Sequence, residues 1–412
     1  MAIHFFQGKE DYLTTHHAND DNKIEIIKNK ISEFFNMKNV HFLFGSGTSC
    51  PAIPNMKGLF EKVEEKIKTE SNIQEDNKNL FNTISKKKNN NIEEILGVLY
   101  SKREFLKGII EPEDIEKYKE CNKLIHFIEK IIFDEINISF TENTNTENAS
   151  IENASIENTN TVVVVLDIYK SFYQKIALRN KDLSRINIFT TNNDLFNEQA
   201  LDALNIHYIN GFNGGLNKYF NPAMFNYTYS KRMDTTIDRF EPVENMVYLY
   251  KIHGSINWIE DTSSNNNYFG IKEEYKPFYD ETKSTLIYPT PMKQNKSLGS
   301  PYSDLFREFQ HKLLEPNSVL FVIGYSFSDE HVNDIIYRAL ATNSTFNLVI
   351  INNIGEDKPI CKINDNRIFK VWEDDNNEPI HYFKQIVNKL LPNLDAFKQK
   401  DILAEFIKQI KE

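Results

Sequence analysis

The sequence has little cysteine, and what it has is poorly placed for a metal or a disulfide framework. Its three cysteines, Cys50, Cys121 and Cys361, lie far apart in 412 residues and form no Cys-x-x-Cys pair. The sequence therefore supports neither a zinc ribbon nor a disulfide scaffold. Long apolar runs are missing too, because the longest, TVVVVLDIY, is far too short to span a bilayer. The N-terminus lacks the basic and apolar regions of a signal peptide, so we expect a soluble, cytoplasmic protein without zinc.

The chain also lacks an excess of basic residues. It carries 48 Lys and Arg against 59 Asp and Glu, a formal net charge of −11. Proteins that bind nucleic acid on their own usually show the opposite balance, so nucleic acid is not expected as the main ligand of this chain. A hydrophobic share of 40% and an aromatic share of 12% predict a large packed core instead.

Helical periodicity dominates the first half of the chain. An entry helix is predicted within 20–37, followed by the apolar strand NVHFLF, the turn GSGTS and a helix in which apolar residues recur every four positions. Two more amphipathic helices are predicted within 91–100 and 114–136. The polar repeat at 141–161 has almost nothing with which to build a core, and we expect a solvated linker there rather than a recognition tail.

The pattern changes after Leu166. Short apolar runs such as INIFT, IHYI, MVYLYK, TLIYPT, SVLFVI and NLVII alternate with helical stretches, which predicts an α/β fold with a doubly wound, mostly parallel sheet. The expected domain boundaries are 1–58 for the entry helix and first βα unit, 59–180 for a helical module, 181–378 for the rest of the sheet domain, and 379–412 for two amphipathic helices split by Pro392. These last helices either cap the sheet or dock another subunit.

Small and polar residues follow five of the predicted strands, where ligands of parallel sheets bind. The first strand is followed by Gly45, Ser46, Gly47, Thr48 and Ser49. Glycines here let the backbone approach a pyrophosphate, and a helix N-terminus would supply unpaired N–H donors. A steric reason for the glycines is the alternative, since Gly-rich turns are common.

The other four strand ends carry hydrogen-bonding groups. Asn192 and Asp194 follow INIFT, and Asp194 either binds a ligand or caps the next helix. His253 and Gly254 follow MVYLYK, where the histidine is either a buried structural residue or a catalytic group. Gly324 and Ser326 follow SVLFVI, with Asp329 as the N-cap of the next helix, and Asn352 follows NLVII. Together these residues predict one site at the edge of the sheet.

Four segments resemble the sirtuin superfamily, and specifically the bacterial sirtuin-like domains of anti-phage defence systems. They are GSGTSCPAIPNMKGL, TTNND, KIHGSINW and GYSFSDEHVNDI, in family order. The resemblance implies a Rossmann-like NAD-binding domain with a helical module inserted after the first βα unit, at about 59–180.

The resemblance also implies roles for individual residues. Gly45, Gly47 and Ser49 would line the diphosphate of NAD, Asn192 and Asp194 would lie by the nicotinamide ribose, and His253 would be the catalytic base. Gly324 and Ser326 would close over the NAD molecule, and Asn352 would face its adenosine side.

Two departures separate the chain from deacylase sirtuins. Their four-cysteine zinc module cannot be built here, and their IPDFR segment corresponds to Ile53, Pro54, Asn55, Met56 and Lys57. The expected activity is therefore hydrolysis of NAD, as a substrate, to nicotinamide and ADP-ribose. The alternatives are a sensor of NAD or ADP-ribose without turnover, a nucleic-acid-cleaving effector, and a zinc-free deacylase.

The resemblance further implies that NAD consumption is gated. The size of the chain resembles the stand-alone sirtuin-like subunit that pairs with a HerA-type hexameric ATPase, and a homo-oligomer is expected as well.

Overall fold

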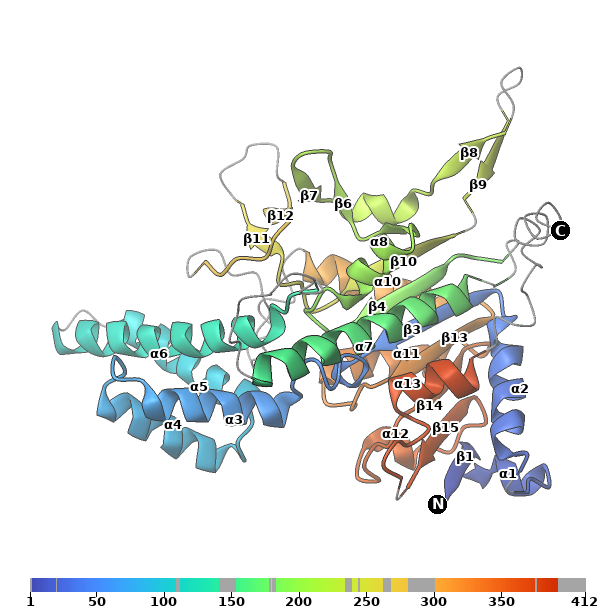
Figure 1. The fold of residues 1–412 in the computed structure, drawn as a ribbon, viewed down its shortest axis with the longest axis horizontal. Coiled ribbons are helices and arrows are strands. Elements are labelled where there is room, and N and C mark those ends of the chain that lie inside the picture. The colour runs from blue at the N-terminus through green and yellow to red at the C-terminus, as the bar shows by residue number, and fades with distance from the viewer. Residues whose placement is uncertain are drawn as a thin grey trace.

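The computed structural model describes residues 2–391 except 20, 109–111, 141–152, 178, 180–182, 234–238, 244, 262–267, 281–300 and 375. Helices cover both faces of a large central sheet, and a group of helices extends from one side of it (Figure 1). The predicted strand TLIYPT and the second C-terminal helix, beyond Pro392, lie outside the described residues.

The central sheet is mostly parallel. Its strands run in the order β2 (Glu10–Asp11), β1 (Ile3–Gln7), β15 (Ile368–Glu373), β14 (Asn347–Ile351), β13 (Ser318–Ile323), β3 (Asn39–Phe44), β4 (Ile186–Thr190), β10 (Met246–Lys251) and β5 (His207–Ile209). The pairs from β15 to β5 are parallel, and β1 and β2 add an antiparallel edge. This architecture is consistent with the Rossmann-like fold predicted from the sequence.

The central strands read as unbroken apolar runs because both of their faces are buried. Phe42 of β3 packs against Phe172 of α7 (Asn153–Ile176), with ring centres 5.1 Å apart. Leu43 points the other way, into a cluster with Phe309 of α10 (Tyr302–Leu314) and Ile336 of α11 (Glu330–Thr342). The first face is also covered by α2 (Lys23–Phe35), α13 (Phe383–Gln385) and the π-type turn η3 (Ile386–Leu390).

Four helices between β3 and α7 pack on one another and extend to one side of the sheet (Figure 1). They are α3 (Met56–Thr69), α4 (Glu75–Lys87), α5 (Ile92–Lys107) and α6 (Pro112–Ile136). Asparagine side chains cap two of them: Asn55 accepts the N–H of Gly58, and Asn91 accepts those of Glu93 and Glu94. In the described part of the chain, every helix is too short or too polar to cross a membrane.

Helix α7 begins at Asn153, so it reaches back into the segment 141–161 that the sequence predicts as a linker. Its later residues, among them Val165 and Tyr169, are buried against the sheet. Once such a segment is held in helical form by packing, adding further turns costs little, and this extends the helix into the polar repeat.

Shorter elements complete the fold. A small antiparallel sheet contains β11 (Trp258–Glu260), β12 (Ile271–Glu273), β7 (Lys218–Phe220) and β6 (Phe212–Asn213), and β8 (Ser230–Arg232) pairs with β9 (Phe240–Pro242) in a projecting ribbon (Figure 1). The remaining short helices are α1 (Tyr12–Thr15), η1 (Ser46–Thr48), α8 (Phe196–Ala203), η2 (Pro222–Asn226) and α12 (Pro359–Lys362).

The strand order reverses between β3 and β13. From β3 the chain moves through β4 to the edge strand β5 and back to β10. It then crosses to the other side of β3 with β13, followed by β14 and β15. In open α/β sheets, ligands bind beyond the carboxyl ends of the strands at such a point. We call the residues that follow β14, β13, β3, β4 and β10 the rim; all five predicted groups of site residues belong to it.

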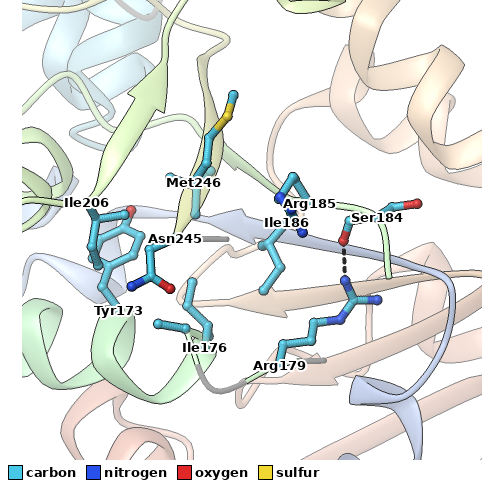
Figure 2. Close-up of a pocket in the computed structure, with 11 residues that line it drawn as sticks. Tyr173, Ile176, Arg179, Ser184, Arg185, Ile186, Ile206, Asn245 and Met246 are labelled. Atoms are coloured by element: carbon cyan, nitrogen blue, oxygen red, sulfur yellow. Dashed lines mark hydrogen bonds between the residues drawn. The ribbon is translucent and has the colours of Figure 1, made fainter. Parts of the chain in front are cut away.

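A pocket lies at the opposite, N-terminal ends of β4 and β10, and contains none of the predicted site residues (Figure 2). Arg179 on its wall donates hydrogen bonds to the backbone carbonyls of Phe35, Met37, Lys38 and Ser184. Burial and the charge of Arg185 lower the pKa of Arg179 to about 10, which still leaves it charged at neutral pH. Arg179 thus joins the ends of α2 and α7 to the start of β4.

We expect Arg179→Met to lower the free energy of unfolding by about 2 kcal/mol or more, because several half-buried carbonyls lose a charged donor. Urea unfolding measures the change. The matched control is Arg239→Met, since Arg239 is 72% exposed and pairs with the nearby Glu241. An equal effect of the two substitutions would contradict the role given to Arg179.

Candidate functional site

The turns after β3 and β13 are in direct backbone contact at the centre of the rim. A Cβ added to Gly45 would lie 2.5 Å from the carbonyl oxygen of Gly324, and one added to Gly47 would lie 2.7 Å from the Cα of Gly324. Gly324 itself has a φ of +65°, and its own Cβ would lie 2.7 Å from the nitrogen of Thr48. Close approach of these two turns therefore requires glycine at all three positions.

This contact changes the interpretation of the first turn. The N–H groups of Gly45 and Gly47 donate to Ile323 and Gly324, and those of Thr48 and Ser49 donate to carbonyls within the turn. Helix α3 starts only at Met56, so the turn is not a helix N-terminus. The prediction of unpaired helix N–H donors at Gly45–Ser49 was wrong at these four positions, because two of the donors join the turns and the other two close the first turn itself. Ser46 and Gly47 are nevertheless exposed on the rim.

Side-chain hydroxyls of the first turn meet the amide of Asn192. The Nδ2 of Asn192 donates to the Oγ1 of Thr48 at 3.1 Å and to the Oγ of Ser49 at 3.0 Å. Tyr169 of α7 donates to the Oγ1 of Thr48 at 2.7 Å. Because both amide hydrogens of Asn192 are used in this way, its carbonyl oxygen is the group left to act on a ligand.

Asp194 uses its two carboxylate oxygens for two purposes. Its Oδ2 accepts the hydroxyl of Ser49 at 2.6 Å, and its Oδ1 accepts the backbone N–H of Phe196 at the start of α8, at 3.1 Å. Of the two alternatives left open by the sequence, the structure shows the contact with the helix start. Asp194 also fixes the Ser49 side chain, which accepts a hydrogen bond from Asn192. Only 3% of the Asp194 surface is exposed, so its carboxylate contacts other residues of the cluster more than solvent.

Tyr169 is a member of this cluster that the sequence does not reveal. Burial, and then the charge of Asp194, raise the pKa of the Tyr169 hydroxyl, so it stays protonated and able to donate. The residue lies in an apolar helical run, where a tyrosine is no different from any other core aromatic. The sequence holds no signal for its role.

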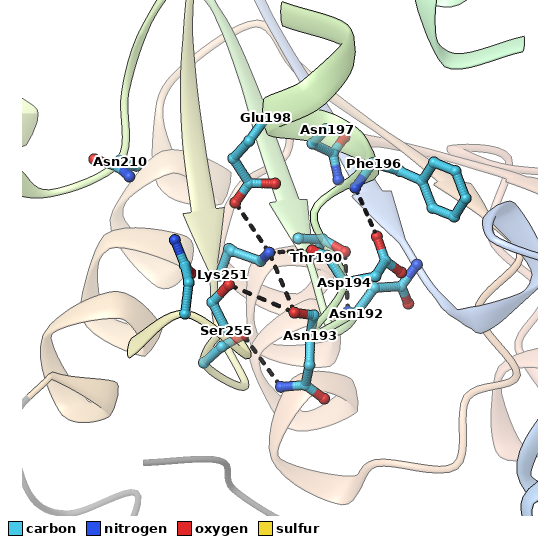
Figure 3. A network of polar contacts seen from close by, with 12 residues as sticks. Thr190, Asn192, Asn193, Asp194, Phe196, Asn197, Glu198, Asn210, Lys251 and Ser255 are labelled. Atoms are coloured by element: carbon cyan, nitrogen blue, oxygen red, sulfur yellow. Dashed lines mark hydrogen bonds and ion pairs between the residues drawn. The ribbon is translucent and has the colours of Figure 1, made fainter. Parts of the chain in front are cut away.

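Lys251 is a second member that sequence reasoning missed. It ends strand β10, and its ammonium lies 2.9 Å from Glu198 and donates to the backbone carbonyls of Asn193 and Asp194 (Figure 3). Both partners of the Lys251–Glu198 ion pair are buried. A lysine at the end of an apolar strand was the available signal, because lysine is rarely buried without a partner. Lys251 ties the loop after β4 to β10.

His253 follows β10 at the next strand end. The side chain of Asn193 donates to the backbone carbonyls of His253 and Gly254, at 2.9 and 3.1 Å. Gly254 has a φ of +86°, a backbone conformation that is strained for residues with a side chain, so the turn requires glycine at this position. The Nε2 of His253 lies 3.0 Å from the Oδ2 of Asp329. The hydroxyl, amide and imidazole groups therefore come from loops that are bonded to one another.

The protein contains a structural histidine for comparison. His41 lies inside the sheet on β3, fully buried, beside the amide of Asn187. Burial lowers the pKa of His41 to about 3, so this ring is neutral at all physiological pH values. His253 differs because it lies at the rim beside a carboxylate.

The other predicted residues lie on the β13–β14 side of the rim. Ser326 is exposed, and its Oγ lies 2.7 Å from that of Ser328. Asn352 donates from Nδ2 to the carbonyl of Tyr325 at 2.9 Å, so it braces the turn that contains Gly324. Within the described residues, no group of three or more His, Cys, Asp or Glu side chains is placed to hold a metal ion.

Gly324→Ala should lower the free energy of unfolding by about 2 kcal/mol, because a side chain is strained at this φ and would press on the turn of Gly47 and Thr48. Equilibrium unfolding in urea is the measurement. Gly215→Ala is the control, since a Cβ there meets no atom within 4 Å. If the two variants were equally stable, the contact between the turns would not be the constraint described.

Lys251→Met should lower the free energy of unfolding by about 3 kcal/mol at neutral pH, since it leaves Glu198 buried without its cation. Burial already raises the pKa of Glu198 from 4.5, and the substitution should raise it further. A carboxyl whose pKa is higher in the folded than in the unfolded protein costs stability when it ionises. The destabilisation caused by Lys251→Met should therefore shrink as the pH falls toward 4.5.

Urea unfolding between pH 4.5 and 8 measures this dependence. The double variant Lys251→Met, Glu198→Gln is the control, because it carries no buried carboxylate. Its stability difference from the parent should change less with pH than that of the single variant, and the same slope in both would contradict the assignment.

Comparison with known proteins fits this geometry. Residues 186–380 match the family model described as SIR2-like domain. No curated protein matches the sequence. The matched stretch contains Asn192, Asp194, His253 and Gly324, whereas the turn of Gly45–Ser49 precedes it. The part of the chain that runs from β4 past β15 is thus similar to a SIR2-like domain, and SIR2-like domains bind NAD.

Proposed function

We propose that this protein is an NAD glycohydrolase of an anti-phage defence system, which cleaves NAD to nicotinamide and ADP-ribose. The observation that carries the proposal is the hydrogen-bonded cluster of Thr48, Ser49, Asn192 and Asp194, joined through Asn193 to the backbone of His253. The cluster lies at the point where the strand order reverses, and its later members belong to the stretch similar to a SIR2-like domain.

In this proposal NAD lies across the rim. The diphosphate passes over the exposed residues Ser46 and Gly47, and the adenosine side lies toward Asn352, whose amide braces the Gly324 turn. Nicotinamide ribose lies toward Asn192 and His253. The overall charge of the protein is no obstacle, because hydroxyl donors such as that of the exposed Ser46 can contact phosphate oxygens without basic side chains.

Cleavage of the N-glycosidic bond develops positive charge on the ribose. The bond from C1′ to the nicotinamide nitrogen breaks, nicotinamide leaves with the electron pair, and a water oxygen bonds to C1′. The carbonyl oxygen of Asn192 can accept a hydrogen bond from that water and stabilise the developing charge, because its amide hydrogens are held by Thr48 and Ser49.

His253 acts as the base in this scheme. Its ring accepts a proton from the attacking water, or from a ribose hydroxyl that is ionised in its place, and general-base help contributes roughly a hundred- to ten-thousand-fold. Asp194 contributes indirectly, because it holds Ser49 and thereby the amide of Asn192. The buried network leaves these groups few alternative positions, which lowers the cost of orienting them during the reaction.

We extend the proposal to gating. Uncontrolled loss of NAD would be lethal to a cell, so activity should depend on self-association or on a HerA-type ATPase partner. The helices α3–α6, which follow the first turn of the rim in the chain, form the inserted module of this proposal and offer a surface away from the sheet (Figure 1).

His253→Ala and Asn192→Ala should each reduce NAD hydrolysis at least a hundredfold, because one removes the base and the other the group that orients water. The assay follows nicotinamide and ADP-ribose by chromatography, without any acylated peptide, for the chain alone and with its genomic neighbour. His207→Ala is the matched control, because His207 is exposed at the start of β5.

The same assay separates the alternatives. A sensor would bind NAD without forming nicotinamide, and a zinc-free deacylase would release nicotinamide only with an acylated peptide. Unchanged NAD hydrolysis in folded His253→Ala would overturn the mechanism. Full activity of a solitary monomer would overturn the gating.

A further inference from the structure

The imidazole of His253 lies beside a carboxylate from the other half of the sheet. Its Nε2 is 3.0 Å from the Oδ2 of Asp329, and the exposed fractions of the two side chains are 11% and 9%. His253 follows β10, whereas Asp329 precedes α11 and follows β13. This is therefore a contact across the rim, between loops on opposite sides of β3 and β4.

Asp329 is held rigidly by the helix that it caps. Its Oδ1 accepts the N–H groups of His331 and Val332, at 3.0 and 3.3 Å. Its backbone carbonyl accepts the hydroxyl of Tyr325 at 3.1 Å. One carboxylate oxygen is thus fixed by α11, which sets the position of the oxygen that faces His253.

The other groups around the pair come from α10, α11 and the loop after β4. The ring of Phe306 in α10 lies 6.4 Å from that of His253 and also 6.4 Å from that of His331 in α11. Asn193 contacts the backbone of His253, and the ammonium of Lys251 is directed to Glu198. Among these described neighbours, the charged group that pairs with the imidazole is the carboxylate of Asp329.

We propose that Asp329 is a positioning residue for His253: its Oδ2 orients the imidazole and compensates the positive charge that the ring acquires when it accepts a proton. This inference rests on the proposed function of His253 as the base. When a proton leaves water or a ribose hydroxyl, an N–H bond forms on the imidazole, and the resulting imidazolium faces a carboxylate at 3.0 Å.

The charge of Asp329 should affect the basicity of His253 in one definite direction. A carboxylate near a histidine favours the charged form of the ring, so removal of the charge should make His253 a weaker base. The acid limb of the activity profile should then move to lower pH. The plateau rate should also fall, because the transition state loses its compensating charge.

Asp329→Asn tests the proposal without disturbing the helix, because asparagine caps helices about as well as aspartate does. We expect the acid limb of kcat/KM to move down by about one pH unit. We expect kcat to fall about tenfold or more, with KM for NAD within about twofold of the parent. Asp11→Asn is the matched control, since Asp11 caps α1 through the N–H groups of Leu13 and Thr14, remote in sequence and structure from His253.

A second measurement does not depend on activity. NMR titration of the His253 ring should show the midpoint in Asp329→Asn about one pH unit below that of the parent, and no change in Asp11→Asn. If the parent did not hydrolyse NAD but this shift was present, the proposed function would fail and the pairing would stand. An unchanged midpoint and an unchanged pH profile in folded Asp329→Asn would overturn the inference.

Discussion

The candidate site depends on the direct contact between two backbone turns. Gly45 and Gly47 after β3 meet Gly324 after β13, at distances that exclude a Cβ. This contact closes the centre of the rim and decides where the side chains of Thr48 and Ser49 are held. Their hydroxyls bond to Asn192, and through Asn192 the position of the next strand end is set. The glycines thus determine the site through sterics, and the hydrogen bonds follow from the geometry that they allow.

Asp194 and Asp329 each bond to the start of a helix with one carboxylate oxygen and to a side chain of the site with the other. Asp194 supports the start of α8 with one oxygen and holds Ser49 with the other, and Asp329 caps α11 with one oxygen and faces His253 with the other. In both cases the helix terminus fixes the carboxylate, so the group that it serves is oriented without a separate support. Local helix capping and the geometry of the site are therefore carried by the same side chains.

The sequence predicted the central strands and the mostly parallel sheet well, because strands buried on both faces give unbroken apolar runs. It did not reveal β15 or β1 at the sheet edge, where Lys370 and His4 interrupt the apolar pattern. Asn192, Asp194 and His253 could be found because polar residues stand out at strand ends. Tyr169 and the Lys251–Glu198 pair could not be assigned roles, because their partners come from distant segments that only tertiary packing brings near.

Helix α7 connects features that are otherwise separate. It covers one face of the sheet (Figure 1). There Phe172 packs on Phe42, and Tyr169 donates a hydrogen bond to the hydroxyl of Thr48. One helix thus carries both a core contact of the sheet and a hydroxyl of the site. A change in where α7 rests on β3 would move the Tyr169 hydroxyl and, through Thr48, the amide of Asn192.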